Sequence, residues 1–252
     1  MKLAVIGYGH LGRALVKGLK KNGFPAADIF VSAATEQTLI RARENGLIPC
    51  GSPLAAAEKA DIVFITLKKN VFEAVASSLA PAVSGRIFVS FMAGITQAQT
   101  EALLGAPVIR AMPSIAIADC DGIIGHTACP PELERIFHSL GFAFEIPEED
   151  IEKVTAVSGS GLGFAAYMLD AYARGCERFG FSPELAHRIT EITFRNAAAN
   201  PDYAGLAAAV ATKGGSTEAG ILSFEKDDVP EAVYRGMLAA YRKMSAKPDP
   251  NV

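Results

Sequence analysis

Cysteine, histidine and tryptophan are scarce in this sequence. Its 252 residues include four cysteines, four histidines and no tryptophan. The cysteines are widely spaced and form no CxxC pair: Cys50, Cys120, Cys129 and Cys176. This scatter argues against a disulfide framework and against a structural zinc site. We therefore expect no metal, and we expect a reduced, cytoplasmic protein.

An excess of basic charge and long hydrophobic runs are also missing. The chain has 24 Lys and Arg residues against 27 Asp and Glu residues, a net charge of −3, so it offers no basic field to a nucleic-acid backbone. No apolar run approaches the ~18 residues of a transmembrane helix. The opening segment is apolar too briefly for a signal peptide. We expect no nucleic-acid and no membrane partner, but a small-molecule ligand.

The first two-thirds of the chain alternates short apolar runs with helical patterns. The runs predict strands at residues 2–6, 29–32, 62–67, 87–90, 108–111, 122–125 and 142–146. Between them, helices are predicted at residues 11–21, 36–45 and 71–79. Strands this apolar, joined by helices, are typical of a parallel sheet covered on both faces. Residues 1–150 are therefore predicted to form a Rossmann-like, doubly wound α/β domain.

The character of the chain changes near residues 147–150. Ala-rich helical patterns then follow at residues 161–179, 183–200, 203–210, 217–224 and 230–244, and the tail at 247–252 is expected to fray. Ser182 is a predicted N-cap, with Pro183 at the first helical position. Residues 151–252 are thus predicted to form an all-helical domain. Apolar residues on more than one helix face indicate burial against another subunit or an internal core.

A glycine-rich loop follows the first predicted strand and opens the first helix. It has the GxGxxG spacing: Gly7, Tyr8, Gly9, His10, Leu11 and Gly12. The first glycine permits a tight turn, the second lets a pyrophosphate approach the backbone, and the third lets helix and strand pack closely. The helix N-terminus offers N–H groups to the phosphates. The loop predicts a dinucleotide site; the alternative is a glycine-rich turn without a ligand.

The end of the second predicted strand bears on which dinucleotide binds. NAD sites usually place an acidic residue there, but the first acid, Glu36, comes late. Without a carboxylate to repel a 2′-phosphate, NADPH is favoured and NADH remains possible. Ser32 and Thr35 are placed to hydrogen-bond the phosphate, or they are ordinary loop residues.

Two further segments combine adjacent glycines with hydroxyl residues, at residues 157–161 and 213–218. Such segments at a helix start provide backbone N–H donors for a carboxylate or phosphate. The alternative is purely structural: Gly214 and Gly215 end one helix, and Ser216 is the N-cap of the next.

Six segments stand in a fixed order along nearly the whole chain: residues 7–12, 66–69, 93–95, 110–114, 155–163 and 212–217. Together they resemble the pyrroline-5-carboxylate reductase family, which makes proline in its last biosynthetic step. The corresponding family motifs are GxGxMG/A, a strand ending in Lys-Pro, Ala-Gly, Arg-x-Met-Pro-Asn, Thr-Ala-x-Ser-Gly-Ser-Gly-Pro-Ala and Ser-Pro-Gly-Gly-Thr-Thr. Order and spacing make this match more specific than any single motif.

The resemblance implies an oxidoreductase that reduces the cyclic imine 1-pyrroline-5-carboxylate to L-proline by hydride transfer from NAD(P)H. It assigns a catalytic role to Thr217, whose hydroxyl is expected to hydrogen-bond the imine nitrogen or a water that protonates it. The implied substrate-binding residues are Ser160, Lys213, Gly214, Gly215, Ser216 and Thr217, with the N–H groups of the last three around the carboxylate. The implied cofactor residues outside the opening loop are Leu67, Lys68, Ala93, Met112 and Pro113. Family members pair their helical domains, which implies a homodimer or a higher homo-oligomer.

The chain departs from the family motifs at several prolines. Lys69, Leu162 and Lys213 stand where the family has proline, and Ser114 stands where it has asparagine. Lost prolines loosen turns, and Lys213 adds a positive charge beside the carboxylate site. Two alternatives follow: a reductase of a related imine acid, such as pyrroline-2-carboxylate or a six-membered analogue, and a non-catalytic dinucleotide-binding protein.

Overall fold

A computed structural model describes residues 1–244, so the predicted frayed tail lies outside the described residues. The chain divides into two compact units, one of Met1–Gly159 with the residues from Tyr241 onward, the other of Ser160–Ala240. Residues 151–159 therefore belong to the first unit, because α7 (Ile151–Val154) and the π-helical turn after it (Thr155–Gly159) pack against the sheet. Within residues 1–244, no helix has the length and apolarity needed to cross a membrane.

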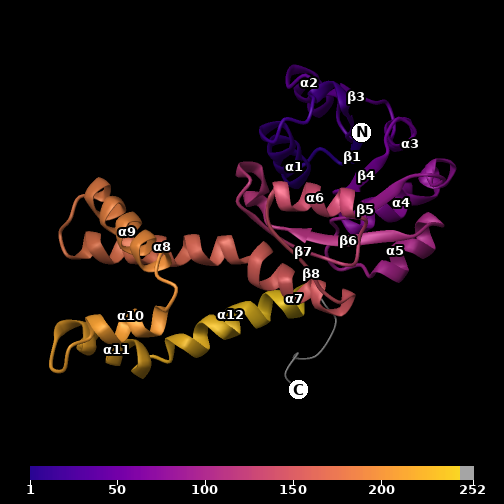
Figure 1. The fold of residues 1–252 in the computed structure, drawn as a ribbon. Helices are drawn as coiled ribbons and strands as arrows, with labels where there is room; N and C mark the ends of the chain where they lie inside the picture. Colours follow the sequence, from indigo (N-terminus) through magenta and orange to yellow (C-terminus); the bar gives the residue numbers. More distant parts are fainter. Residues whose placement is uncertain (245–252) are drawn as a thin grey trace. The chain divides into compact units, whose positions relative to one another are not determined.

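The first unit is built on an eight-stranded sheet with the order β3-β2-β1-β4-β5-β6-β7-β8 (Figure 1). The strands are β1 (Leu3–Ile6), β2 (Ile29–Ser32), β3 (Ile48–Pro49), β4 (Ile62–Ile65), β5 (Ile87–Ser90), β6 (Val108–Pro113), β7 (Gly122–His126) and β8 (Gly141–Glu145). The seven predicted strands are confirmed. The two-residue β3 was not predicted, since so short a segment carries no periodicity.

The sheet is mostly parallel, as predicted, but its last two strands reverse. β1 to β6 run parallel, whereas β7 is antiparallel to β6 and β8 is parallel to β7. Only the 3₁₀ turn η3 (Ile115–Asp119) connects β6 to β7. A parallel crossover needs about a dozen residues or more, so this short link returns the chain antiparallel.

Helices cover both faces of the sheet, which confirms the doubly wound α/β class. Along β1, Leu3 and Val5 face one apolar cluster, and Ala4 and Ile6 face the other. The first cluster takes residues from α1, α2 and α6, and the second takes residues from α3, α4 and α5. The helices are α1 (His10–Lys21), α2 (Glu36–Glu44), α3 (Pro53–Ala57), α4 (Lys69–Leu79), α5 (Gln97–Leu104), α6 (Pro131–Ser139) and α7 (Ile151–Val154). The shorter turns are η1 (Ala26–Asp28), η2 (Ala80–Ala82), η4 (Glu148–Asp150) and the π-helical η5 (Thr155–Gly159).

The second unit is entirely helical, as predicted. Its helices are α8 (Gly161–Arg178), α9 (Pro183–Ala198), α10 (Tyr203–Val210), α11 (Ser216–Lys226) and α12 (Val229–Met244), the last of which ends in the first unit. Ser182 caps α9 by accepting a hydrogen bond from the Leu185 N–H at 3.3 Å, and Pro183 is the first helical residue. Both local predictions are confirmed, because cap geometry depends only on neighbouring residues.

Candidate active site

The opening loop adopts the geometry that its glycines predict. Gly7 has φ +103°, and a Cβ there would lie 2.7 Å from Leu67 Cδ2. A Cβ on Gly12 would collide with the Gly7 carbonyl oxygen. A Cβ on Gly9 would meet no atom within 4 Å. Gly7 and Gly12 are therefore required by the protein itself, whereas the space above Gly9 is open to a ligand.

Helix α1 presents unpaired backbone donors at its first turn. The N–H groups of His10, Leu11 and Gly12 have no hydrogen-bond partner within residues 1–244, and the first internal bond of the helix runs from Arg13 N–H to the Gly9 oxygen at 3.0 Å. The first turn contains no acidic residue, so the positive end of the helix dipole is not neutralised. The residues present thus fit the pyrophosphate of a dinucleotide.

The side chains of this loop point in different directions. Tyr8 is buried in the apolar cluster beneath α1, and the partly buried Leu11 packs against the same cluster. Burial raises the pKa of the Tyr8 phenol, while the nearby Arg13 lowers it, and the phenol stays protonated at neutral pH. His10 is exposed.

Thr66 is a loop-stabilising residue that the sequence analysis did not identify. Its hydroxyl donates a short hydrogen bond to the Gly7 carbonyl oxygen and a second one to the Ile6 carbonyl oxygen at 3.3 Å. Its N–H also donates to Ile6 at 2.9 Å, which continues the β1–β4 pairing. Thr66 therefore holds the phosphate loop in place from the neighbouring strand. The only sequence signal for this role was the position of Thr66 inside the family segment at residues 66–69.

The other predicted cofactor residues lie at the ends of parallel strands. Ser32 ends β2 and is buried, with its carbonyl accepting the Gly7 N–H at 3.0 Å. Leu67 and Lys68 follow β4, Ala93 follows β5, and Met112 and Pro113 end β6. Because these strands run parallel, all of these residues lie at the edge of the sheet where the opening loop lies. β1 separates β2 from β4, which is where the strand order reverses and where ligands bind in open α/β sheets.

Lys68, Met112 and Thr35, three of the predicted cofactor residues, differ in exposure and in their local contacts. Lys68 is exposed at the N-terminus of α4, whereas Met112 is buried. Thr35 is the N-cap of α2, and its hydroxyl accepts the Thr38 N–H at 3.3 Å. Thr35 thus caps α2, and its contact with the cofactor stays a prediction.

A buried arginine organises the turn after β5. Arg110 is only 1% exposed, and its guanidinium binds Glu148 at 2.7 Å and Glu152 at 2.8 Å. It also donates to the Met92 carbonyl at 3.1 Å, and Glu152 accepts the Gly94 N–H at 3.1 Å. Arg110 belongs to one of the six family motifs, but the motif alone indicates no role for it. The structure shows that it joins β6 and α7 to the turn that carries Ala93.

The twin-glycine corner lies in the second unit, just before α11. Gly215 is the N-cap of this helix and Ser216 is its first residue, so the alternative in which Ser216 caps the helix is wrong. The Gly215 N–H donates to the Thr212 carbonyl at 2.8 Å, and the Gly214 N–H donates to Glu218 Oε2 at 2.7 Å. Within residues 1–244, the N–H groups of Ser216 and Thr217 have no partner. Of the three N–H groups expected to bind the substrate carboxylate, the Gly215 N–H is already engaged, and those of Ser216 and Thr217 remain.

Ser160 stands directly before α8, at the position of its N-cap, and its carbonyl accepts the Phe164 N–H at 3.1 Å. Ser158, just before it, is buried and donates its hydroxyl to the Val154 carbonyl at 2.8 Å. The hydroxyl of Ser158 therefore supports the π-helical turn, and Ser160 is the partly exposed serine of the motif.

Comparison with known proteins identifies the family. The curated pyrroline-5-carboxylate reductase of Pseudomonas aeruginosa is 32% identical over 259 aligned residues, which cover 96% of this chain and 95% of that protein. The chain belongs to the pyrroline-5-carboxylate reductase family. Residues 148–247 match the family description "Pyrroline-5-carboxylate reductase dimerisation", and residues 2–94 match "NADP oxidoreductase coenzyme F420-dependent". The resemblance drawn from the six motifs is therefore confirmed.

Solved structures agree with this reductase family. The pyrroline-5-carboxylate reductase of Coxiella burnetii superposes with a TM-score of 0.85 at 26% identity, covering 96% of this chain and 97% of that one. The Plasmodium falciparum pyrroline carboxylate reductase, solved with NADP bound, has a TM-score of 0.87 at 21% identity over 98% of this chain and 97% of that one, and shares the fold.

Proposed function

We propose that this protein reduces 1-pyrroline-5-carboxylate to L-proline with NADPH as the hydride donor. The observation that carries this proposal is the 32% identity to the Pseudomonas aeruginosa reductase over nearly the whole length of both chains. The dinucleotide-binding geometry of the opening loop adds support, because the open space at Gly9 and the unpaired N–H groups of α1 fit a pyrophosphate. The cytoplasmic location remains a prediction.

The opening loop is proposed to bind the pyrophosphate through the N–H groups of His10, Leu11 and Gly12. Ser32 and Lys68, at the ends of neighbouring strands, are the proposed contacts to the adenosine ribose and its 2′-phosphate. When bound, the reduced nicotinamide supplies the hydride. Ala93, Met112 and Pro113 are proposed to line the nicotinamide end of the site.

The corner before α11 is proposed to hold the substrate. The Ser216 and Thr217 N–H groups, at the positive end of the helix, are the donors for the ring carboxylate. Lys213 is exposed next to them and adds positive charge. The Thr217 hydroxyl donates to and accepts from the imine nitrogen or a bridging water, so it tolerates the change from iminium to amine. Ser160 completes the proposed set.

Loss of the Thr217 hydroxyl is expected to slow imine reduction. We expect Thr217→Val to lower kcat/KM by on the order of tenfold or more, because a hydroxyl that assists proton transfer is removed without changing the volume. Thr217→Ser, which keeps the hydroxyl, is the matched control and should stay near the wild-type rate. The measurement is NADPH oxidation monitored in the presence of the imine. An undiminished rate in the valine variant would refute the assigned role.

A panel of cyclic imines tested with NADPH and NADH examines the whole proposal. The expected result is the highest kcat/KM for pyrroline-5-carboxylate with NADPH. Lys213 and Leu162, which stand at family prolines, favour one second candidate: a reductase of pyrroline-2-carboxylate or of a six-membered imine acid. A higher kcat/KM for one of those imines would support that candidate. Cofactor binding without turnover of any imine would overturn both.

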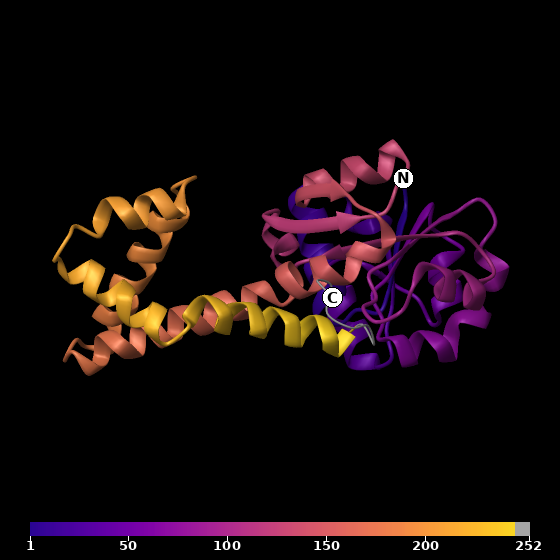
Figure 2. The same cartoon turned by 90° about the horizontal axis from the view of Figure 1, so that it is seen from below.

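The helical unit is proposed to pair with a second copy of the chain. Among residues 160–240, all of them described, only Ala186, Thr190 and Leu238 are buried, so five helices share almost no internal core. Figure 2 shows α12 alongside α8, and an apolar groove of about 330 Å³ lies between them, lined on α8 by Phe164, Tyr167 and Met168. Exposed apolar surfaces of this kind mark protein interfaces.

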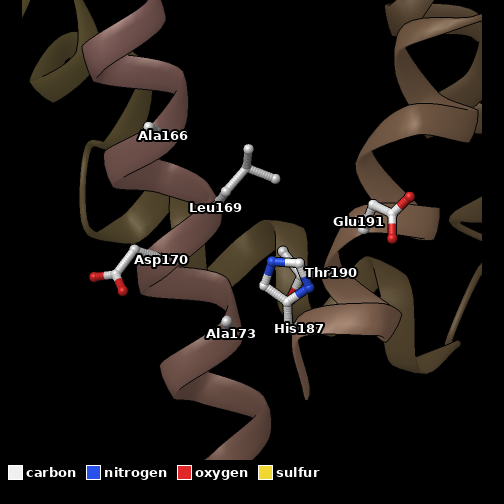
Figure 3. A pocket seen from close by; sticks show the side chains of 7 residues that line it. All are labelled: Ala166, Leu169, Asp170, Ala173, His187, Thr190 and Glu191. Carbon is white, nitrogen blue, oxygen red and sulfur yellow. The ribbon is translucent and has the colours of Figure 1, made fainter. Parts of the chain in front are cut away.

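A second pocket in the helical unit lies between α8 and α9 (Figure 3). Leu169 and His187 point into the space between the two helices, whereas the carboxylate of Asp170 points away from α9. Thr190 is buried in the middle of α9, where its hydroxyl donates to the Ala186 carbonyl at 2.8 Å. Two open faces on one small helical unit are consistent with the proposed homodimer, or with a higher homo-oligomer.

A charge placed in the apolar groove is expected to weaken this pairing. Tyr167 is 70% exposed in the single chain. Tyr167→Asp should shift sedimentation or light scattering from dimer to monomer, because an unpaired carboxylate is costly to bury in an interface. Phe142→Asp is the matched control, since Phe142 is 69% exposed but lies on β8 in the other unit. Equal masses for the wild type and the Tyr167 variant would contradict the proposed interface.

A further inference from the structure

The corner before α11 is held by a side chain from within the helix. Gly214 has φ +75°, a left-handed conformation that favours glycine. Its N–H donates to Oε2 of Glu218 at 2.7 Å, a charge-assisted hydrogen bond. Glu218 is in the first turn of α11, so its carboxylate also lies at the favourable end of the helix dipole.

The second glycine is constrained by the residues before it. The Gly215 N–H donates to the Thr212 carbonyl at 2.8 Å, and a Cβ on Gly215 would lie 2.6 Å from the Thr212 hydroxyl oxygen. Both glycine N–H groups are thus engaged within the loop. The Ser216 and Thr217 N–H groups remain, and their direction is set by how the corner is held.

Two hydrogen bonds hold Gly214: the bond from the Gly215 N–H to the Thr212 carbonyl closes the turn that contains Gly214, and the bond to Glu218 ties that turn to α11. A Cβ placed on it would meet no atom within 4 Å, and its neighbour Lys213 is exposed. Lys213 also lacks the ring that would restrict φ at that position. Within residues 1–244, the hydrogen bond from the Gly214 N–H to Glu218 therefore links the tip of the corner to the helix that carries Thr217.

We propose that Glu218 is a positioning residue for substrate binding: its carboxylate ties the turn that contains Gly214 to α11 and so keeps the Ser216 and Thr217 N–H groups aimed at the substrate carboxylate. This inference rests on the proposed function of the corner. Glu218 acts on the substrate only through the backbone. Its effect therefore falls on binding of the imine and not on binding of NADPH.

The test compares two substitutions of Glu218 that differ in one property. Glu218→Ala removes the acceptor for the Gly214 N–H, and we expect the KM for the imine to rise about tenfold, as for the loss of one hydrogen bond to a charged group. Glu218→Gln keeps an acceptor oxygen, and its KM should stay within about threefold of wild type. The kcat and the NADPH Kd should change little in either variant. Glu225→Ala, which removes an exposed carboxylate from the last turn of the same helix, is the control for charge and helix stability.

Hydrogen exchange at the Gly214 amide provides a readout that does not require activity. The amide should exchange faster in Glu218→Ala than in the wild type or in Glu218→Gln, with unchanged thermal midpoints. An unchanged imine KM in Glu218→Ala, or equal losses in both variants, would overturn the inference. If the wild type protects this amide but reduces no imine in the panel, the proposed function fails while the geometry of the corner stands.

Discussion

Replacement of Gly9 by alanine is expected to weaken NADPH binding by on the order of a hundredfold, because the methyl group keeps the phosphates away from N–H donors whose charge-assisted bonds contribute ~1.5–3 kcal/mol each. A Cβ at this position meets no protein atom within 4 Å, and Gly9 has φ −79°, which alanine adopts without strain. The fold should therefore survive. Titration of NADPH fluorescence measures the affinity, and a thermal melt without cofactor measures the fold.

Two other glycines provide the controls for this result. Gly51 also has open space around its Cβ position but lies outside the opening loop, so Gly51→Ala should leave NADPH affinity unchanged. Gly12→Ala should lower the thermal midpoint even without cofactor, because its methyl collides with the Gly7 carbonyl. Wild-type affinity in Gly9→Ala would remove the opening loop from the cofactor site.

Replacement of Arg110 by methionine is expected to destabilise the protein by up to about 3 kcal/mol, the cost of leaving two partly buried carboxylates without their charged partner. Methionine fills much of the volume of arginine, so the loss reports on charge more than on packing. Glu148 and Glu152 would keep their N–H donors from Gln97 and Gly94 but would lose the guanidinium. Urea unfolding monitored by circular dichroism measures the change in the free energy of unfolding.

An exposed ion pair is the control for Arg110. Lys17 and Asp119 lie 2.8 Å apart, with both side chains more than half exposed. Solvent screens such pairs, so Lys17→Met should leave the unfolding midpoint almost unchanged. If Arg110→Met unfolded at the same urea concentration as the control, the buried network would not stabilise the turn after β5.

Much of the first unit follows from the pattern of apolar residues. β1 and β4 are buried along their whole length, and their continuous apolar runs predicted this. The end of β6 was predicted two residues early, at Ala111, because Met112 and Pro113 pair with β7, which lies after them in the chain. Proline is rare within strands, so local propensity ends the strand where tertiary pairing extends it.

The site was predictable to the extent that its chemistry is carried by the backbone. Glycine spacing indicated the phosphate loop, because each glycine is required by a contact within a few residues or by a ligand. Side chains acting across the fold were missed. Thr66 holds the Gly7 carbonyl, and Glu218 holds Gly214. The hydrophobic periodicity of a sequence does not show which acceptor a hydroxyl will bind or which donor a carboxylate will bind.

By itself, the sequence determined the α/β class, the helical second part, the capped start of α9 and the dinucleotide loop, because hydrophobic periodicity, cap residues and glycine requirements act over a few neighbouring residues. Only the tertiary structure decided the reversal of β7, the burial of Arg110 between Glu148 and Glu152, and which N–H groups of the corner before α11 remain free. These features depend on residues brought together by folding: Arg110 and Glu148 are 38 positions apart in the chain. The free energy of such a pair depends on burial, and the sequence alone does not show burial.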